Sequence, residues 1–172
     1  MVDVENNFLN KNLLNNLQQI IYSSEINWFW YPSMVSDKNG NKTKQDDQGY
    51  WYHNFYSDKE IKSTYFNDLI LPFLKKLKVK LLYNVRLNCM FNPTGSKRVI
   101  SDWHIDVGNK NSRTSIYYVN NNNGYTEIQA DSIVSQKSVE NTLISFPSLY
   151  KHRAIGQTDI ARRMVINFNY IV

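Results

Sequence analysis

The chain has 172 residues, of which 42% are hydrophobic and 14% aromatic, with a formal net charge of +5 and a single cysteine. This length and hydrophobic content predict one domain with a proper core and exclude an intrinsically disordered protein. One cysteine excludes an internal disulfide, so Cys89 is expected to be a buried thiol in a reducing compartment. The positive charge would suit acidic partners such as nucleic acid, but Lys and Arg are scattered along the sequence.

Neither a targeting segment nor a membrane segment is expected. The first ten residues, MVDVENNFLN, lack the basic region and apolar core of a signal peptide. The longest aliphatic cluster, LILPFL at 69–74, is far too short to span a bilayer. We therefore expect a soluble, cytoplasmic protein with no membrane partner.

The first predicted element is an amphipathic helix over residues 7–21. Its apolar residues recur at a spacing of three to four: Phe8, Leu9, Leu13, Leu14, Leu17, Ile20 and Ile21. Two aromatic stretches follow, INWFWYP at 26–32 and GYWYHNFYSD at 49–58, and we expect them to pack in the core. The polar loop between them, at 36–49, is a candidate border of a substrate entrance.

A second helix is predicted from Ser57 to about residue 78. Ser57 with Glu60 fits a capping box, an apolar stripe at helical spacing follows, and Pro72 should kink or restart the helix.

From residue 79 the apolar period changes to two, which predicts short strands separated by polar turns. The strand-like runs are VKLLYNVRLNCMF, RVISDWHID, TSIYYVN, GYTEIQA, NTLISF, HRAIG and RRMVINFNYIV. The NNNG tract at 121–124 is interpreted as a hairpin turn. Helices followed by strands predict a single α+β domain over 1–172, in which a helical and aromatic part at 1–78 buttresses an antiparallel sandwich or barrel at 79–172.

Two imidazoles and a carboxylate form a candidate metal site. On a strand, His104 and Asp106 point to one face, and the chain between Asp106 and His152 is long enough to return to a neighbouring strand. Two histidines and one carboxylate leave three positions of an octahedral metal open, which suits iron(II) oxygenases. The same ligands would also fit zinc, and a His-x-Asp string alone arises often by chance.

An arginine pair, Arg162 and Arg163, opens the last strand-like run. An arginine on an inner strand face is costly to bury unless it meets an anion, and its planar fork matches a carboxylate. Arg86 lies in the middle of another run, where it would either bind an anionic substrate or pair with an acidic residue.

Taken together, these motifs resemble the iron(II)- and 2-oxoglutarate-dependent oxygenases of the double-stranded β-helix fold, in particular the compact prolyl-hydroxylase-like branch with its many viral members. The matching strings are WHID for the metal motif, HRAIG for the distal histidine, RRMVINFNY for the co-substrate arginine and TSIYYVN for a co-substrate tyrosine. The resemblance implies Fe(II) held by His104, Asp106 and His152, with 2-oxoglutarate and dioxygen as co-substrates.

The same resemblance implies that Arg163 and Tyr118 hold the distal carboxylate of 2-oxoglutarate. Adjacent arginines on a strand face opposite ways, so only one of Arg162 and Arg163 can enter the pocket. Similar sequences favour Arg163, which would share its face with Val165, Asn167 and Asn169. The alternative, Arg162, stays open at this stage.

The chain also departs from related patterns. Prolyl hydroxylases carry a co-substrate tyrosine before a proline where this chain has Asn92, which would donate a hydrogen bond in its place or act only as a turn residue. The nucleic-acid demethylases of the superfamily carry a second arginine where this chain has Asn169. An intact Asp106 is unlike the halogenases, which replace the carboxylate.

The expected activity is therefore hydroxylation of a substrate with release of succinate and carbon dioxide. Alternatives are a non-catalytic jelly-roll metal-binding or scaffold protein, and an oxygenase directed to nucleic acid. The substrate stays open among a prolyl side chain in a peptide, a free amino acid, a nucleobase and a small metabolite. His53 and Trp103 are expected to have packing roles.

Overall fold

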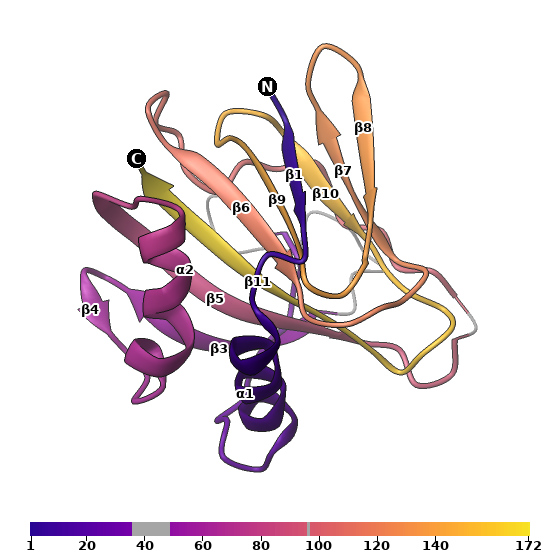
Figure 1. Ribbon diagram of the computed structural model, residues 1–172. Coiled ribbons are helices and arrows are strands. Elements are labelled where there is room, and N and C mark those ends of the chain that lie inside the picture. Colours follow the sequence, from indigo (N-terminus) through magenta and orange to yellow (C-terminus); the bar gives the residue numbers. More distant parts are fainter. Residues whose placement is uncertain (36–48, 96) are drawn as a thin grey trace.

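A computed structural model describes residues 1–35, 49–95 and 97–172, which form one large and one small antiparallel sheet with helices on the outside (Figure 1). The large sheet contains, in spatial order, β1 (Asp3–Asn6), β9 (Thr142–Pro147), β6 (Arg113–Tyr118), β11 (Arg162–Ile171), β5 (Leu81–Phe91), β3 (Tyr50–Ser57) and β2 (Phe29–Tyr31), with β4 (Glu60–Ile61) paired to β3. The small sheet contains β10 (His152–Ile155), β7 (Tyr125–Gln129) and β8 (Ile133–Lys137).

Helix α1 (Lys11–Tyr22), a π-helical turn η1 (Phe66–Ile70) and helix α2 (Leu71–Lys76) cover one face of the large sheet, and the small sheet lies on the other side (Figure 1). The predicted α+β jelly roll of antiparallel strands is confirmed. None of the helices in the described ranges is long and apolar enough to cross a membrane.

The central strand β11 separates the core from the site because its side chains alternate between the two faces of the sheet. The helix-covered face carries Met164, Ile166, Phe168 and Tyr170, all of which are buried in the larger hydrophobic core. The other face carries Arg163, Val165, Asn167 and Asn169. A smaller core lies at the small sheet, where Tyr118, Ile128 and Phe146 are fully buried.

The first predicted helix is present but begins later than residue 7. The Asn10 side chain caps α1 by accepting a 3.0 Å hydrogen bond from the Leu13 amide. Phe8 and Leu9 precede the helix and are buried in the irregular segment between β1 and α1.

The predicted helix start at Ser57 is wrong. Asp58 and Lys59 both have positive φ angles, of 54° and 64°, and form a two-residue turn that joins β3 to β4. The Ser57 hydroxyl donates to the Asp58 carboxylate instead of capping a helix. Because positive φ at both central residues matches the twist of a hairpin, this turn overrides the capping pattern. Pro72 does lie where a helix restarts, in the first turn of α2.

Three further details of the predicted strands are corrected. Residues 98–106 form only two isolated bridges instead of a continuous strand. The tract 121–124 joins β6 of the large sheet to β7 of the small sheet, so it is not a hairpin turn. The short strands β1 and β8 were not predicted, since their composition is mostly polar.

The aromatic stretches form strands β2 and β3, and they are not uniformly buried. Phe55 is fully buried, whereas Trp30 and Trp51 contact each other on the exposed outer part of the sheet. Most of the candidate entrance loop at 36–49 lies outside the described residues. Cys89 is buried, and burial raises the pKa of its thiol to about 11.

Candidate metal centre and co-substrate pocket

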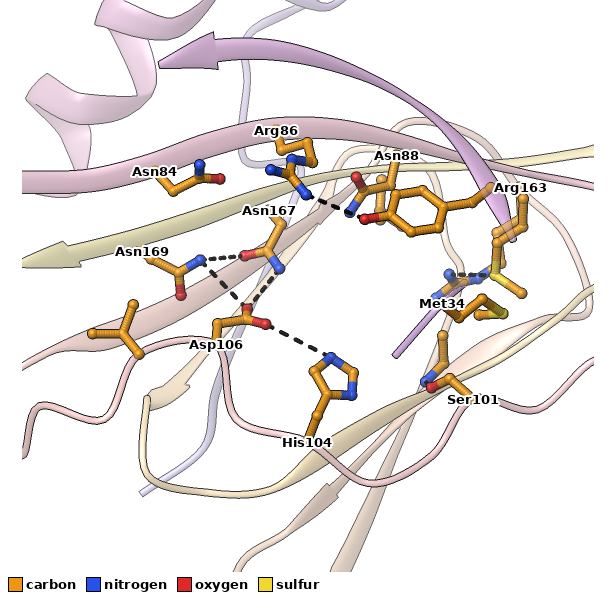
Figure 2. Close-up of a pocket in the computed structure, with 15 residues that line it drawn as sticks. Met34, Asn84, Arg86, Asn88, Ser101, His104, Asp106, Arg163, Asn167 and Asn169 are labelled. Carbon is orange, nitrogen blue, oxygen red and sulfur yellow. Dashed lines mark hydrogen bonds and ion pairs between the residues drawn. The ribbon is translucent and has the colours of Figure 1, made fainter. Parts of the chain in front are cut away.

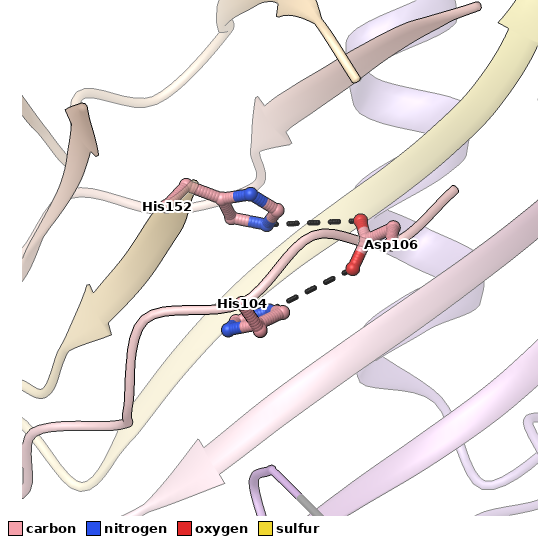
Figure 3. Close-up of side chains that lie close together, drawn as sticks. All are labelled: His104, Asp106 and His152. Atoms are coloured by element: carbon pink, nitrogen blue, oxygen red, sulfur yellow. Dashed lines mark ion pairs between the residues drawn. The ribbon is translucent and has the colours of Figure 1, made fainter. Parts of the chain in front are cut away.

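His104, Asp106 and His152 lie together, with one ligand atom of each within 4.8 Å of the others (Figure 3). The Nε2 atom of His104 lies 3.6 Å from Asp106 Oδ1, and the Nε2 atom of His152 lies 3.7 Å from Oδ2. All three side chains therefore aim donor atoms at one point from two separate segments of the chain. Two imidazoles and a carboxylate are a donor set that fits iron(II).

The two histidines are positioned by backbone pairing. His104 and His152 face each other as an isolated antiparallel bridge and exchange both backbone hydrogen bonds, at 3.0 and 2.9 Å. The His104 Nδ1 atom lies 3.0 Å from the carbonyl oxygen of Asp102. Because a carbonyl only accepts, Nδ1 carries the proton and Nε2 is free to bind a metal.

The imidazole ring of His152 is held more by packing than by hydrogen bonds of its own. Its ring packs edge-on against Phe146 and 4.4 Å, between centroids, from the ring of His104. Burial lowers the pKa of His152 to about 4, against the opposing effect of Asp106. The ring is therefore neutral at pH 7, as a metal ligand must be. The Tyr150 backbone also opposes this lowering of the pKa, and the buried Nδ1 atom of His152 has no hydrogen-bond partner among the described residues.

Amide groups from β11 hold the Asp106 carboxylate. Asn167 Nδ2 donates to Oδ2 at 2.8 Å, and Asn169 Nδ2 donates to the same oxygen at 3.4 Å (Figure 2). The Asn169 oxygen in turn accepts from the Thr114 hydroxyl at 2.8 Å. Burial alone would raise the pKa of Asp106, but the two histidines and these amides outweigh it and lower the pKa. The carboxylate is therefore ionised and oriented toward the histidines.

A pocket of about 360 Å3 opens beside the candidate metal ligands, and its volume falls in the size range of small-molecule sites. Strands β5 and β11 form one wall, on which four cross-strand pairs face the pocket (Figure 2). These pairs are Asn84 with Asn169, Arg86 with Asn167, Asn88 with Val165, and Met90 with Arg163. His104 and Asp106 contribute to the opposite side of the pocket.

Arg163 is a buried cation at one end of this wall, with only 2% of its surface exposed. Its guanidinium donates to Ser138 Oγ at 2.9 Å, to Thr126 Oγ1 at 3.0 Å and to the Met90 sulfur at 3.7 Å. No carboxylate of the described residues lies within ion-pair distance, and two of its five N–H groups lack a described acceptor. A buried guanidinium in this state fits an anionic ligand that supplies the missing charge.

Tyr118 lies behind Arg163, with its ring 5.8 Å from the guanidinium carbon. The Tyr118 hydroxyl is buried without a described hydrogen-bond partner. Burial raises its pKa to about 12; Arg163 opposes the shift, as does Thr126, although the two hydroxyls do not meet in hydrogen-bond geometry. The hydroxyl is therefore protonated, and its proton has no acceptor among the described residues.

Two residues from the sequence analysis lie elsewhere. Arg162 is on the opposite face of β11, with its guanidinium over the ring of Tyr22. The Asn92 amide donates to the carbonyl oxygens of Lys97 and Gln157, at 3.0 and 2.8 Å, outside the pocket that holds the metal cluster. The structure therefore places Asn92 as a link between loops and does not bring it to the pocket that His104, Asp106 and Arg163 line.

Several residues of the site carried no recognisable sequence signal. A Cβ atom added at Gly124 would lie 2.8 Å from Cδ of Arg163, so the absence of a side chain makes room for the arginine. Ser138 and Thr126 reach Arg163 from segments 25 and 37 residues away in the sequence. Only the alternation of β11, which puts Asn167 and Asn169 on the same face as Arg163, could have been read in advance.

Solved structures with the same architecture include prolyl hydroxylases and a member of the 2OG-Fe(II) oxygenase family. A prolyl hydroxylase from Trichoplax adhaerens, in complex with a hypoxia inducible factor peptide fragment, has a TM-score of 0.65 at 16% identity over 99% of this chain and 83% of its own. An oxidoreductase of the 2OG-Fe(II) oxygenase family from Burkholderia pseudomallei has a TM-score of 0.68 at 9% identity, over 98% and 84%. A Pseudomonas putida prolyl-4-hydroxylase has a TM-score of 0.60 at 14% identity, over 99% and 92%.

A scan against protein-family models and a search of curated proteins found no match to the sequence. The chain thus has the fold of the 2OG-Fe(II) oxygenases and carries a His/Asp/His cluster, of which His104 and Asp106 line its pocket. Prolyl hydroxylases are among its structural neighbours. The fold that the motif resemblance predicted, that of the 2OG-Fe(II) oxygenases and prolyl hydroxylases, is confirmed.

Proposed function

We propose that the protein is an Fe(II)- and 2-oxoglutarate-dependent dioxygenase that hydroxylates its substrate and releases succinate and carbon dioxide. One observation carries the proposal: Arg163, a buried arginine with no carboxylate partner among the described residues, lines the same pocket as the His104 and Asp106 side chains. When bound, iron(II) supplies the activation of dioxygen needed to oxidise an unreactive C–H bond.

The residues of this chain would bind and orient the reactants. His104, Asp106 and His152 would hold the metal, and the amides of β11 would keep the Asp106 carboxylate directed at it. The two free N–H groups of Arg163 would bind the distal carboxylate of 2-oxoglutarate as a bidentate pair. Tyr118 would add a donor to the same carboxylate. Burial of this end of the pocket excludes water and strengthens these interactions.

The neighbours support, as one candidate, a peptide substrate, because the Trichoplax enzyme was solved with a peptide fragment bound. A small molecule and a nucleobase are the other candidates for the substrate of this chain. All three classes would enter the pocket beside the metal, on the side away from Arg163.

The experiment is to measure succinate formation from 2-oxoglutarate with Fe(II) and ascorbate, together with binding of 2-oxoglutarate to the Mn(II)-loaded protein by calorimetry. The matched pair is Arg163→Ala and Arg162→Ala. Losing two charge-assisted hydrogen bonds should weaken binding at least ~30-fold in Arg163→Ala. Arg162→Ala should bind within about twofold of wild type, since its guanidinium lies over Tyr22.

Equal losses in the two variants would contradict the assignment of Arg163. Metal binding without 2-oxoglutarate binding and without turnover would instead favour the non-catalytic scaffold, in which the cluster holds a metal such as zinc.

A further inference from the structure

A second arginine, Arg86, lines the pocket near the candidate metal ligands His104 and Asp106. Arg86 lies on β5 directly opposite Asn167, the residue that donates to the metal-site carboxylate Asp106 (Figure 2). On the same wall Arg163 lies opposite Met90, four residues along β5 from Arg86. At ~3.3 Å per residue the two arginines are separated by roughly 13 Å along the strands. The pocket therefore has one cation at its inner end and another beside the metal.

Among the residues that the structure describes, Arg86 has no acidic partner. Its Nε donates to Asn54 Oδ1 at 2.9 Å, its Nη1 donates to the Tyr50 hydroxyl at 3.2 Å, and its guanidinium stacks on Tyr52 at 4.8 Å. No carboxylate of the described residues lies within ion-pair distance of Arg86. Of the two interpretations of this arginine left open by the sequence, pairing with an acidic residue is therefore not what the structure shows.

The contacts of Arg86 orient its guanidinium and leave donors available. Two of the five N–H groups are used, so one on Nη1 and both on Nη2 have no described acceptor. Its neighbours on the same strand face, Asn84 and Asn88, also line the pocket. The Asn88 amide oxygen is buried and has no hydrogen-bond partner in the described part of the chain. This wall thus presents unused donors and an unused acceptor side by side.

We propose that Arg86 binds a carboxylate group of the primary substrate, and that the Asn88 oxygen accepts from an N–H or O–H group next to that carboxylate. This proposal rests on the proposed function, which assigns the other arginine, Arg163, to 2-oxoglutarate. One guanidinium supported by a neutral tyrosine hydroxyl matches a single negative charge, whereas a phosphate dianion would need a further cation. The substrate class is therefore a carboxylic acid, either a free amino acid or an acidic or C-terminal carboxylate of a peptide.

The test follows the Arg86 Nε–H signal by NMR in protein loaded with Zn(II) and saturating 2-oxoglutarate. The probe is acetate and its matched neutral control is acetamide. The signal is assigned by its disappearance in Arg86→Gln, and the signals of Arg98 and Arg162 serve as internal controls. Acetate should shift the Arg86 signal saturably with a midpoint in the millimolar range, on the order of 1–10 mM. Acetamide should have no effect, and the control signals should stay in place.

Two results would overturn the proposal: no saturable acetate shift at Arg86, or an equal shift with acetamide. A shift by inorganic phosphate at a tenfold lower concentration than acetate would overturn the carboxylate class. If 2-oxoglutarate does not bind at all, the proposed function fails, and the acetate titration of the Zn(II)-loaded protein still decides the role of Arg86.

The source of the carboxylate is distinguished by turnover. Free amino acids and short peptides with acidic or C-terminal carboxylates are compared as stimulators of succinate formation, each beside its primary amide. Any compound that stimulates should lose at least tenfold of its effect when its carboxylate is converted to the amide, and stimulation should fall similarly in Arg86→Gln but not in Arg98→Gln. Equal stimulation by acid and amide would contradict the proposal.

Discussion

At the scale of single residues, the position of the Arg163 side chain depends on a glycine as well as on polar partners. Gly124 lies where any side chain would collide with Cδ of Arg163, with the Asn122 side chain and with a backbone oxygen of Ile155. A backbone oxygen cannot move aside as a side chain can, so a side chain at position 124 would displace either Arg163 or the backbone around it.

We predict that Gly124→Ala displaces the Arg163 guanidinium and weakens 2-oxoglutarate binding to the Mn(II)-loaded protein by roughly tenfold or more, the loss of about one charge-assisted hydrogen bond. Gly108→Ala is the matched control, because a Cβ there meets nothing within 4 Å. Calorimetric titration of both variants measures the difference. Unchanged affinity in Gly124→Ala would show that the arginine position is not critical.

The chemistry of single residues could be read from the sequence, but their partners could not. Histidine, aspartate and arginine have few roles in a strand interior, so His104, Asp106 and Arg163 stand out by type and spacing alone. Ser138 and Thr126 are common residues whose contacts with Arg163 exist only once β7 and the segment after β8 are folded against β11.

At the scale of secondary-structure elements, one buried side chain joins three parts of the fold. Asn141, which precedes β9, has a φ of 58° and is 6% exposed. Its amide group donates to the Leu9 carbonyl at 2.9 Å and accepts from the Leu9 amide at 2.8 Å and from the Tyr117 hydroxyl at 3.0 Å. It therefore ties the segment before α1 to β6 and β9.

We expect Asn141→Ala to lower the free energy of unfolding by about 3 kcal/mol, because it leaves three buried polar groups without partners and puts alanine at a positive φ. Asn16→Ala is the control, since Asn16 is exposed on α1, and it should change stability by less than ~0.5 kcal/mol. Urea unfolding followed by circular dichroism measures both. If Asn141→Ala lowers the free energy of unfolding by less than ~1 kcal/mol, the three hydrogen bonds of Asn141 do not stabilise the fold as proposed.

Strands were predicted well where alternation was strong and poorly where turns decided the structure. The runs that became β5, β6, β7, β9, β10 and β11 were recognised from their period of two. The hairpin at Asp58 and Lys59 was missed because a capping pattern occupies the same residues and the two interpretations differ only in backbone φ. Residues 98–106 were predicted to form a strand, but they pair with the neighbouring strand at only two positions.

At the scale of the whole molecule, the site joins segments that do not otherwise share a sheet. His152 belongs to the small sheet, Arg163 to the large sheet, and Asp106 to the connection before β6. A metal and a co-substrate bound in the pocket would therefore link these parts in the folded state only.

We predict that Mn(II) with 2-oxoglutarate, each at ~100 times its dissociation constant, stabilises the fold by about 2.7 kcal/mol or more. For a chain of this size the melting temperature should rise by roughly 5–10 °C. The Asp106→Ala variant should lose the rise, because it lacks the carboxylate between the two histidines. Thermal unfolding with and without both ligands measures it. An equal rise in Asp106→Ala would place the binding elsewhere.

The sequence by itself was sufficient to predict the antiparallel jelly roll and to identify His104, Asp106 and His152 as one set of candidate metal ligands. Both inferences rest on local properties, the two-residue period of strands and the chemistry of side chains. Only the tertiary structure decided that Asn92 lies outside the pocket, that Arg86 lies inside it with no acidic partner among the described residues, and that Gly124 makes room for Arg163. These facts depend on contacts between distant segments, which no local pattern encodes.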